Sequence, residues 1–187
     1  DHLDYHKTFD AYRDAKKTFF DNLPKQAFAI TNADDKNGAV MLQNCKAALR
    51  SYSTRTAADF KGRILEESIE GMLLDFNGQE VSVRFVGHFN VSNLLAVYGA
   101  AVMLGNEPQE VLRVMSESAP VTGRFETIRS PKGVSAIIDY AGILTQNFMN
   151  VSDTFMDENS IIWWACGGTM KGESVPRIGF LKELLYS

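Results

Sequence analysis

The pattern of apolar and polar positions near the start of the chain has the period of a helix. Between residues 9 and 20, apolar and aromatic positions recur at helical spacing, and charged positions fall on the other side. The apolar face consists of Phe9, Tyr12, Ala15, Phe19 and Phe20. The pattern therefore predicts an amphipathic helix over residues 9–20, and the sequence Asn-Leu-Pro at residues 22–24 should end it.

Short apolar runs separated by turn signals follow this helix. Residues 27–31 are apolar and β-prone, as in a buried parallel strand, and they lead into the turn-forming sequence NADDKNG. Residues 39–49 favour a helix, and residues 50–54 favour the next strand. A strand, a helix and a strand in this order predict a parallel βαβ crossover, so we expect an α/β fold with a parallel sheet and covering helices.

A tight-turn signal marks an antiparallel region further along the chain. The dipeptide Asn77-Gly78 suits the positive φ angles of a type I′ turn. It lies between two apolar runs, residues 72–76 and residues 80–86. We expect these two runs to pair as a β-hairpin.

Two helices and a second pair of strands are expected after the hairpin. Residues 90–105 predict a helix that Asn90 caps, and residues 107–118 predict another. Residues 124–141 predict two strands joined by the turn Ser-Pro-Lys-Gly. We expect a domain boundary near residues 120–123, where the helical pattern stops.

Composition and charge exclude several classes of function. The 187 residues are 45% hydrophobic, enough for one domain or for a domain and part of another, and the net charge is −4. Without a cluster of Lys and Arg, nucleic acid is not expected as a partner. The two cysteines, Cys45 and Cys166, are too few for a disulfide framework, and no apolar run approaches the roughly 18 to 20 residues that span a bilayer. We therefore expect a soluble, cytoplasmic chain with no membrane partner.

Four sequence motifs follow one another in a specific order. They are DHLDYH with AYRDAK in residues 1–16, AITNADD in residues 29–35, GHFNVSNLLAVYGAA in residues 87–101 and GRFE in residues 123–126. In this order the motifs resemble the Mur ligase family, ATP-dependent enzymes that add amino acids to the peptidoglycan precursor. The residues of the first motif, DHLDYH with AYRDAK, resemble the MurE branch of that family in particular.

The resemblance implies a domain organisation. It places a partial central ATP-binding domain over residues 1–120, with a parallel sheet, helices and a small antiparallel hairpin region. It places the first strands of a Rossmann-like C-terminal ligase domain over residues 121–141. Residues 142–187 match no pattern of the family and stay unassigned. The sequence contains no G-x-x-x-x-G-K-[ST] phosphate loop, so we expect that loop to precede residue 1 in the intact enzyme.

The resemblance also implies a magnesium site at the start of the chain. His2 would contribute to it, although imidazole is an unusual ligand for so hard a cation. Lys16 stands where Mur ligases commonly carry a lysine N-carbamate. A free ammonium would repel Mg²⁺, whereas a carbamate is anionic and offers two oxygens to the metal. The alternative for Lys16 is an unmodified lysine in water, the state expected of its neighbour Lys17.

Four further residues are candidates for binding ATP. Asn90 and Asn93 share one face of a predicted helix, and their amides offer a donor and an acceptor to the edge of adenine. Arg124 suits a phosphate and Asp139 suits ribose hydroxyls, so both resemble residues on the nucleotide side of the domain junction. The alternatives are a helix cap at Asn90 with a polar surface residue at Asn93, and an interdomain ion pair between Arg124 and Asp139.

The resemblance finally implies a reaction that forms a peptide bond. ATP would activate a carboxylate as an acyl phosphate, from which an incoming amine displaces phosphate. The substrates would be the UDP-MurNAc-dipeptide and the third amino acid of the peptide, whose identity this sequence does not specify. We expect the isolated chain to be inactive and to self-associate through unpaired sheet edges. Two alternatives are a non-catalytic scaffold with weak nucleotide binding and a ligase of the folylpolyglutamate or cyanophycin synthetase type.

Overall fold

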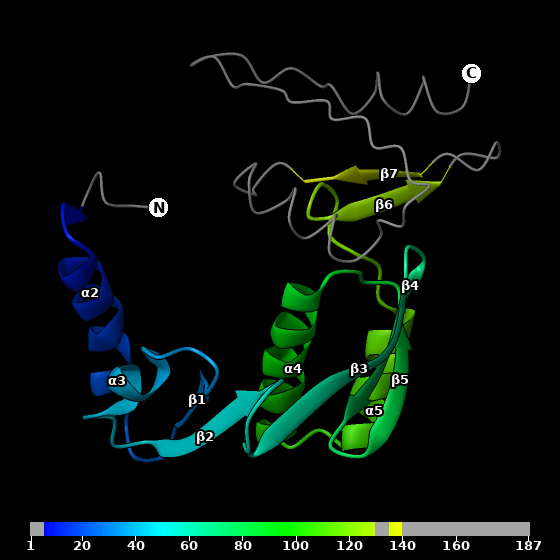
Figure 1. The fold of residues 1–187 in the computed structure, drawn as a ribbon. Helices are drawn as coiled ribbons and strands as arrows, with labels where there is room; N and C mark the ends of the chain where they lie inside the picture. Colours follow the sequence, from blue (N-terminus) through cyan, green and yellow to red (C-terminus); the bar gives the residue numbers. More distant parts are fainter. Residues whose placement is uncertain (1–5, 130–134, 140–187) are drawn as a thin grey trace. The chain divides into compact units, whose positions relative to one another are not determined.

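The computed structural model describes residues 6–129 and 135–139, whose helices and strands are shown in Figure 1. The chain divides into two compact units. The first unit takes in residues 1–65, 73–83 and 88–117, and the second takes in residues 66–72, 84–87 and 118–187. The domain limits expected from the sequence stay a prediction.

Strands β1 to β5 form one sheet, in chain order. β1 (Phe28–Asn32) and β2 (Ala48–Ser53) are parallel neighbours, paired from Phe28 with Ala48 to Asn32 with Tyr52. The connection between them contains α3 (Gly38–Leu42), so the predicted βαβ crossover and the α/β fold are confirmed. β3 (Phe60–Ser68) extends the parallel part, because Tyr52 pairs with Phe60 and Ser53 with Lys61.

The helix predicted over residues 39–49 is wrong in length. α3 ends at Leu42, and residues 48–49 already belong to β2. The main-chain N–H of Ala48 donates to the carbonyl of Ala27 at 3.1 Å, directly before the pairing of β1 with β2 begins. Pairing with β1 holds this segment extended, and it overrides the local helical preference of the sequence.

The hairpin predicted around Asn77-Gly78 is confirmed. β4 (Gly71–Phe76) and β5 (Gln79–Val83) are neighbours in the sheet, and Asn77 and Gly78 have φ angles of 52° and 84°. Both angles are positive, as a type I′ turn requires. The Asn77 amide also ties the turn to β3, because its Oδ1 accepts the main-chain N–H of Lys61 at 2.6 Å.

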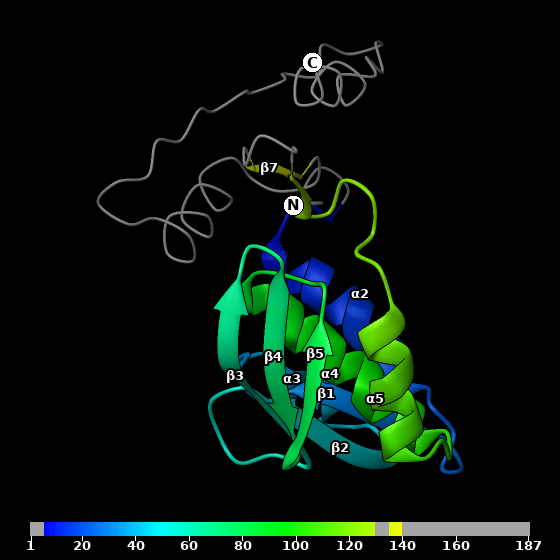
Figure 2. The same cartoon turned by 90° about the vertical axis from the view of Figure 1, so that its right-hand side faces the viewer.

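Helix α4 (His88–Met103) covers one face of the strands and supplies much of their core (Figure 2). Its buried residues are Val91, Leu94, Leu95, Tyr98 and Gly99. The Tyr98 ring meets the Phe60 ring edge-on at a centroid distance of 6.0 Å and lies 5.5 Å from the Phe76 ring. A Cβ at Gly99 would come within 2.7 Å of Phe60 Cδ2, so glycine lets the helix approach this ring. The aromatic cluster fixes α4 against β3 and β4.

Helix α4 begins at His88 rather than at Asn90. Gly87 has a φ of 89°, a left-handed conformation that glycine adopts without strain, and it turns the chain directly before the helix. Asn90 therefore lies in the first turn of α4, and the prediction that Asn90 caps the helix is wrong. Gly105, just after the helix, has a φ of 92°, as expected of a glycine that ends one.

The two remaining helices described in the first unit, α2 and α5, agree with the helices predicted over residues 9–20 and 107–118. Thr8 caps α2 (Phe9–Asp21), its hydroxyl oxygen accepting the N–H of Ala11 at 3.2 Å. No residue of α2 is buried, and Phe19 is 65% exposed. α5 (Pro108–Glu117) packs against β5 (Figure 2).

The second unit contains a two-stranded sheet. β6 (Glu126–Arg129) and β7 (Ser135–Ile138) are antiparallel, as predicted, with Glu126 opposite Ile138. Val86 and Phe125 are buried beside this sheet, and Ile137 packs against them. In the described part of the whole chain, no helix is long and apolar enough to span a membrane.

Candidate functional site

Polar side chains gather on two loops at the carboxyl ends of β1 and β2. We call these loops, residues 32–37 and 53–56, the rim. The carboxyl ends of neighbouring parallel strands lie at the same edge of a sheet, and β1 and β2 are such neighbours. Ligands of open α/β sheets bind outside this edge. The rim is therefore the place in the first unit where a binding site is expected.

Asp34 joins the two loops of the rim. Its Oδ1 accepts the hydroxyl of Ser53 at 2.6 Å. Its Oδ2 accepts the main-chain N–H of Thr54 at 2.8 Å and the Thr54 hydroxyl at 3.1 Å. Ser53 is fully buried, and its oxygen in turn accepts the main-chain N–H groups of Arg55 and Thr56 at 2.9 and 2.7 Å. These bonds form a continuous network across the rim.

The surroundings of Asp34 keep its carboxyl group ionised. Partial burial by itself would raise the pKa of Asp34, but hydrogen bonds from Ser53 and Thr54, with the nearby charge of Arg55, hold it below the ordinary 3.8. The pKa of the Tyr52 phenol changes in the opposite direction. Burial and the charges of Asp35 and Asp34 raise this pKa above 10.0. At neutral pH the rim therefore holds an anionic Asp34, and the phenol of Tyr52, on β2, is neutral.

The first turns of α4 adjoin the rim and carry both asparagine candidates. Asn93 Nδ2 donates to Asn90 Oδ1 at 3.4 Å, so the structure brings these two amides together. Ser92 lies between them in the sequence, and Asn32 Nδ2 donates to its hydroxyl oxygen across a long 3.5 Å. Asn32 Oδ1 accepts the main-chain N–H of Asp34 at 2.9 Å. Asn32 therefore connects the rim to the first turns of α4, which carry the amide pair. The donors and acceptors of this pair suit the polar edge of a nucleobase.

Of the two candidates for the magnesium site, the structure describes Lys16 but not His2. Lys16 is exposed on α2, and its Nζ lies 4.4 Å from the centroid of the Tyr12 ring. This contact suits an ammonium cation, because the face of an aromatic ring attracts positive charge. His2 lies outside the described residues. Among the residues that are described, no three histidine, cysteine or acidic side chains are grouped to hold a metal ion.

Arg124 and Asp139 lie in the second unit, next to its two strands. Arg124 comes shortly before Glu126, the first residue of β6, and Asp139 directly follows Ile138, the last residue of β7. Arg124 is exposed and Asp139 is half-buried. Between Arg124 and β6, Phe125 is buried with a φ of 53°, an unusual conformation for an aromatic residue. The buried Phe125 ring anchors the chain beside the exposed guanidinium group.

The Asp34 network is the part of the site that sequence reasoning missed. The motif AITNADD indicates only a strand and a loop, and Ser53 and Thr54 carry no motif of their own. The available signal was a pair of polar turn sequences: NADD directly after the strand predicted over residues 27–31, and STRT at the end of the strand predicted over residues 50–54. Their meeting depends on the pairing of β1 with β2.

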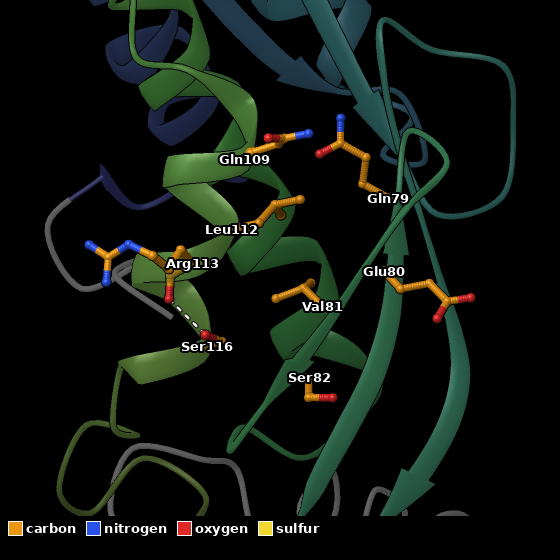
Figure 3. Close-up of a pocket in the computed structure, with 8 residues that line it drawn as sticks. All are labelled: Gln79, Glu80, Val81, Ser82, Gln109, Leu112, Arg113 and Ser116. Atoms are coloured by element: carbon orange, nitrogen blue, oxygen red, sulfur yellow. Dashed lines mark hydrogen bonds between the residues drawn. The ribbon is translucent and has the colours of Figure 1, made fainter.

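A groove of about 470 Å³ lies elsewhere in the first unit, between β5 and α5 (Figure 3). It is lined by Gln79, Glu80, Val81, Ser82, Gln109, Leu112, Arg113 and Ser116. The Arg113 guanidinium is already engaged by Glu110 and Glu117, at 2.7 and 2.6 Å. None of the candidate residues lines this groove, so it is separate from the candidate site.

Two curated proteins are similar to much of this chain. A relative from Phocaeicola vulgatus, named UDP-N-acetylmuramoyl-L-alanyl-D-glutamate--2,6-diaminopimelate ligase, is 62% identical over 141 residues, 75% of this chain and 29% of the relative. A relative of the same name from Cytophaga hutchinsonii is 42% identical over 179 residues, 94% of this chain and 37% of the relative. The second match reaches past residue 141, into the segment that the sequence analysis leaves unassigned. The chain spans roughly a third of the length of these relatives.

A solved structure and a family model agree with these relatives. The solved structure, of a UDP-N-acetylmuramoyl-L-alanyl-D-glutamate--2,6-diaminopimelate ligase, has a TM-score of 0.66 at 29% identity and covers 81% of this chain and 33% of its own. The family model described as the Mur ligase middle domain matches residues 1–101, more than half of the chain. This chain therefore belongs to the Mur ligase family.

Proposed function

We propose that this chain forms part of the ATP-binding centre of a MurE-type ligase. The intact enzyme would use ATP to join 2,6-diaminopimelate to the UDP-MurNAc-dipeptide. The observation that carries the proposal is the 62% identity over 141 residues to a relative with that name. The choice of 2,6-diaminopimelate rests on the names of the relatives alone. Because the chain spans 29% of that relative, we expect catalysis to need the intact enzyme.

Asn90 and Asn93 are the proposed contacts of the adenine base. Their 3.4 Å contact presents two amides side by side in the first turns of α4, next to the rim. Two amides offer both donors and acceptors, which the edge of adenine requires. Ser92, which lies between the two asparagines in the sequence, is bonded to Asn32 at the carboxyl end of β1, and this link supports the role.

Arg124 and Asp139 are the proposed contacts of the phosphates and the ribose. A guanidinium group can bind phosphate oxygens with two parallel hydrogen bonds, and a carboxylate accepts hydrogen bonds from ribose hydroxyls. ATP would supply the phosphoryl group that activates the substrate carboxylate. The exposure of Arg124 supports its part in the proposal.

Magnesium is the second cofactor of the proposal, held by His2 and by a carbamate on Lys16. The support is the resemblance of DHLDYH and AYRDAK to the family. The described residues do not build a metal site by themselves. The ring contact of Lys16 suits the unmodified ammonium, so a carbamate would have to leave the face of the Tyr12 ring.

Nucleotide titration of the purified chain tests the proposal. We expect saturable binding of Mg-ATP and of adenosine by calorimetry. Asn90→Ala and Asn93→Ala should each weaken the affinity for Mg-ATP and the affinity for adenosine by about fivefold. This factor corresponds to the loss of one hydrogen bond of about 1 kcal/mol. Asn106→Ala is the matched control, because the Asn106 amide donates to the Ala101 carbonyl just past the other end of α4. Binding that is unaffected at Asn90 and Asn93 would contradict the proposed site, and no binding at all would favour an inert scaffold.

An enzyme assay tests the expectation that catalysis needs the intact enzyme. The isolated chain is incubated with UDP-MurNAc-dipeptide, 2,6-diaminopimelate and Mg-ATP, and the tripeptide product is sought by mass spectrometry. We expect no product. Rapid turnover would contradict the expectation that catalysis needs the intact enzyme.

We also propose that copies of the isolated chain associate through β1. Within the described sheet, β1 is an edge strand, and the main-chain groups of an edge can pair with another chain. Phe9 and Phe19 add exposed apolar surface on α2. Sedimentation should show dimers that form as the concentration rises, and a monomer at every concentration would contradict this.

A further inference from the structure

We propose that Asp34 is a positioning residue for nucleotide binding: its carboxylate holds the two loops of the rim together beside the asparagine pair. The inference rests on the proposed function and extends it to a residue with no expected contact to the nucleotide. Asp34 would act through Asn32 and the first turns of α4.

The geometry shows that both carboxylate oxygens of Asp34 are engaged by the loop after β2. Both carboxylate oxygens accept hydrogen bonds, and all three donors belong to Ser53 or Thr54. Ser53 is 0% exposed, so its hydroxyl is shielded from water, which would otherwise compete for the carboxylate. A carboxylate engaged in this way joins the loop after β1 to the loop after β2.

The loop that carries Asp34, residues 32–37, is also fixed from two other sides. The main-chain N–H of Asp34 donates to Asn32 Oδ1, and the amide nitrogen of Asn32 reaches Ser92 in α4. At the far end of the same loop, a Cβ on Gly38 would come within 2.3 Å of the Asn32 carbonyl oxygen, so α3 begins in close contact with β1. A displacement of Asp34 would therefore be passed to Asn32 and to the helix turns that carry Asn90 and Asn93.

Asp59 provides a matched comparison, because its partner Ser51 lies on β2, the strand that ends at Ser53. Its Oδ2 accepts the main-chain N–H of Ser51 at 2.8 Å and the Ser51 hydroxyl at 3.0 Å, as the Asp34 carboxylate does with Thr54. Hydrogen bonding lowers the pKa of both carboxyl groups. Asp59 stands before β3 and joins β2 to β3, without a hydrogen bond to the loop after β1. Asp59 therefore shares the chemistry of Asp34 but not its position.

The experiment compares Asp34→Asn with Asp59→Asn in the full 187-residue chain. An asparagine keeps the shape of the side chain, but its amide nitrogen cannot accept the hydrogen bonds of Ser53 or Thr54. Asp34→Asn should weaken adenosine and Mg-ATP binding equally, by about tenfold. The equal loss is expected because the rim adjoins the proposed base contacts. Asp59→Asn should change both affinities by less than about twofold.

Unfolding by urea is measured on the same variants to separate positioning from stability. Unchanged nucleotide affinity in Asp34→Asn would overturn the inference. The inference would also fail if the two variants lose the same free energy of unfolding and Asp59→Asn loses as much nucleotide affinity as Asp34→Asn. If Asp34→Asn does not fold, Thr54→Val decides, because it removes the hydroxyl and keeps the main-chain donor. A loss of about threefold is then expected, and unchanged binding would overturn the inference. A wild-type chain that binds neither ligand would overturn the proposed function itself.

Discussion

Arg124 and Asp139 lie at the same end of the β6–β7 hairpin, because Glu126 at the start of β6 pairs with Ile138 at the end of β7. A residue with a guanidinium group and a residue with a carboxylate, 15 positions apart in the sequence, thus flank one end of the β6–β7 pair. This relationship follows from the register of the two strands. It gives the two candidates a common position, which their separate motifs do not.

Replacing Arg124 with alanine should weaken Mg-ATP binding by about tenfold and leave adenosine binding unchanged. The reason is that the guanidinium group is proposed to bind phosphate oxygens, which adenosine lacks. Parallel calorimetric titrations measure both affinities. Arg63→Ala is the control, since Arg63 pairs with Asp75 at 2.8 Å and lies outside the candidate site. An equal loss of adenosine affinity in Arg124→Ala would contradict a phosphate contact.

A carbamate on Lys16 should be detectable by NMR after incubation with ¹³C-labelled bicarbonate. We expect one carbamate signal in the wild type and in Lys17→Ala, and its loss in Lys16→Ala. Tyr12→Leu should strengthen the signal, because the ring 4.4 Å from Nζ favours the competing ammonium form. A signal that persists in Lys16→Ala would place the modification elsewhere.

Gly99→Ala should lower the free energy of unfolding by about 1–3 kcal/mol, the usual cost of overpacking a core. The added methyl group would come within 2.7 Å of Phe60 Cδ2, and the Phe60 ring is held by Tyr98. Urea denaturation measures the change. In a Phe60→Leu background the same substitution should cost less, because the clash is with the ring. Equal costs in the two backgrounds would show that the ring is not the obstacle.

The stability of the chain should fall in acid, as pH drops below about 4. Hydrogen bonds lower the pKa of Asp34, Asp59 and Asp75 below 3.8 in the folded chain, so the unfolded chain binds protons more readily. Their contribution is complete above that value and is lost as pH falls through the folded pKa values. Each contributes no more than about 1 kcal/mol, because water screens partly exposed groups.

Urea unfolding at neutral pH and at about pH 3 measures this dependence. Asp34→Asn should reduce the difference between the two conditions, since the substituted side chain no longer titrates. An identical difference in the wild type and in Asp34→Asn would show that Asp34 is not among the groups responsible.

Elements that depend on local chemistry were predicted well. The apolar period of residues 9–20 predicts α2, because a helix places such positions on one face. Asn77-Gly78 predicts the hairpin, because few other residues adopt the two positive φ angles of its turn. The spacing of Asn90 and Asn93 likewise places their amides together once a helix forms. The error in the helix over residues 39–49 occurs where a distant segment intervenes, because pairing with β1 extends residues 48–49. The error at Asn90 is local, because Gly87 turns the chain and α4 begins at His88.

The amino-acid sequence by itself determined the amphipathic helix α2, the Asn77-Gly78 turn, the order of the βαβ unit and the candidate residues within each motif, because these depend on neighbours along the chain. Only the tertiary structure decided which loops meet. Asp34 reaches Ser53 and Thr54, and Asn32 reaches Ser92, because strand pairing and helix packing close long stretches of chain into contact. No local pattern encodes such a contact, since its energy comes from partners that fold into place together.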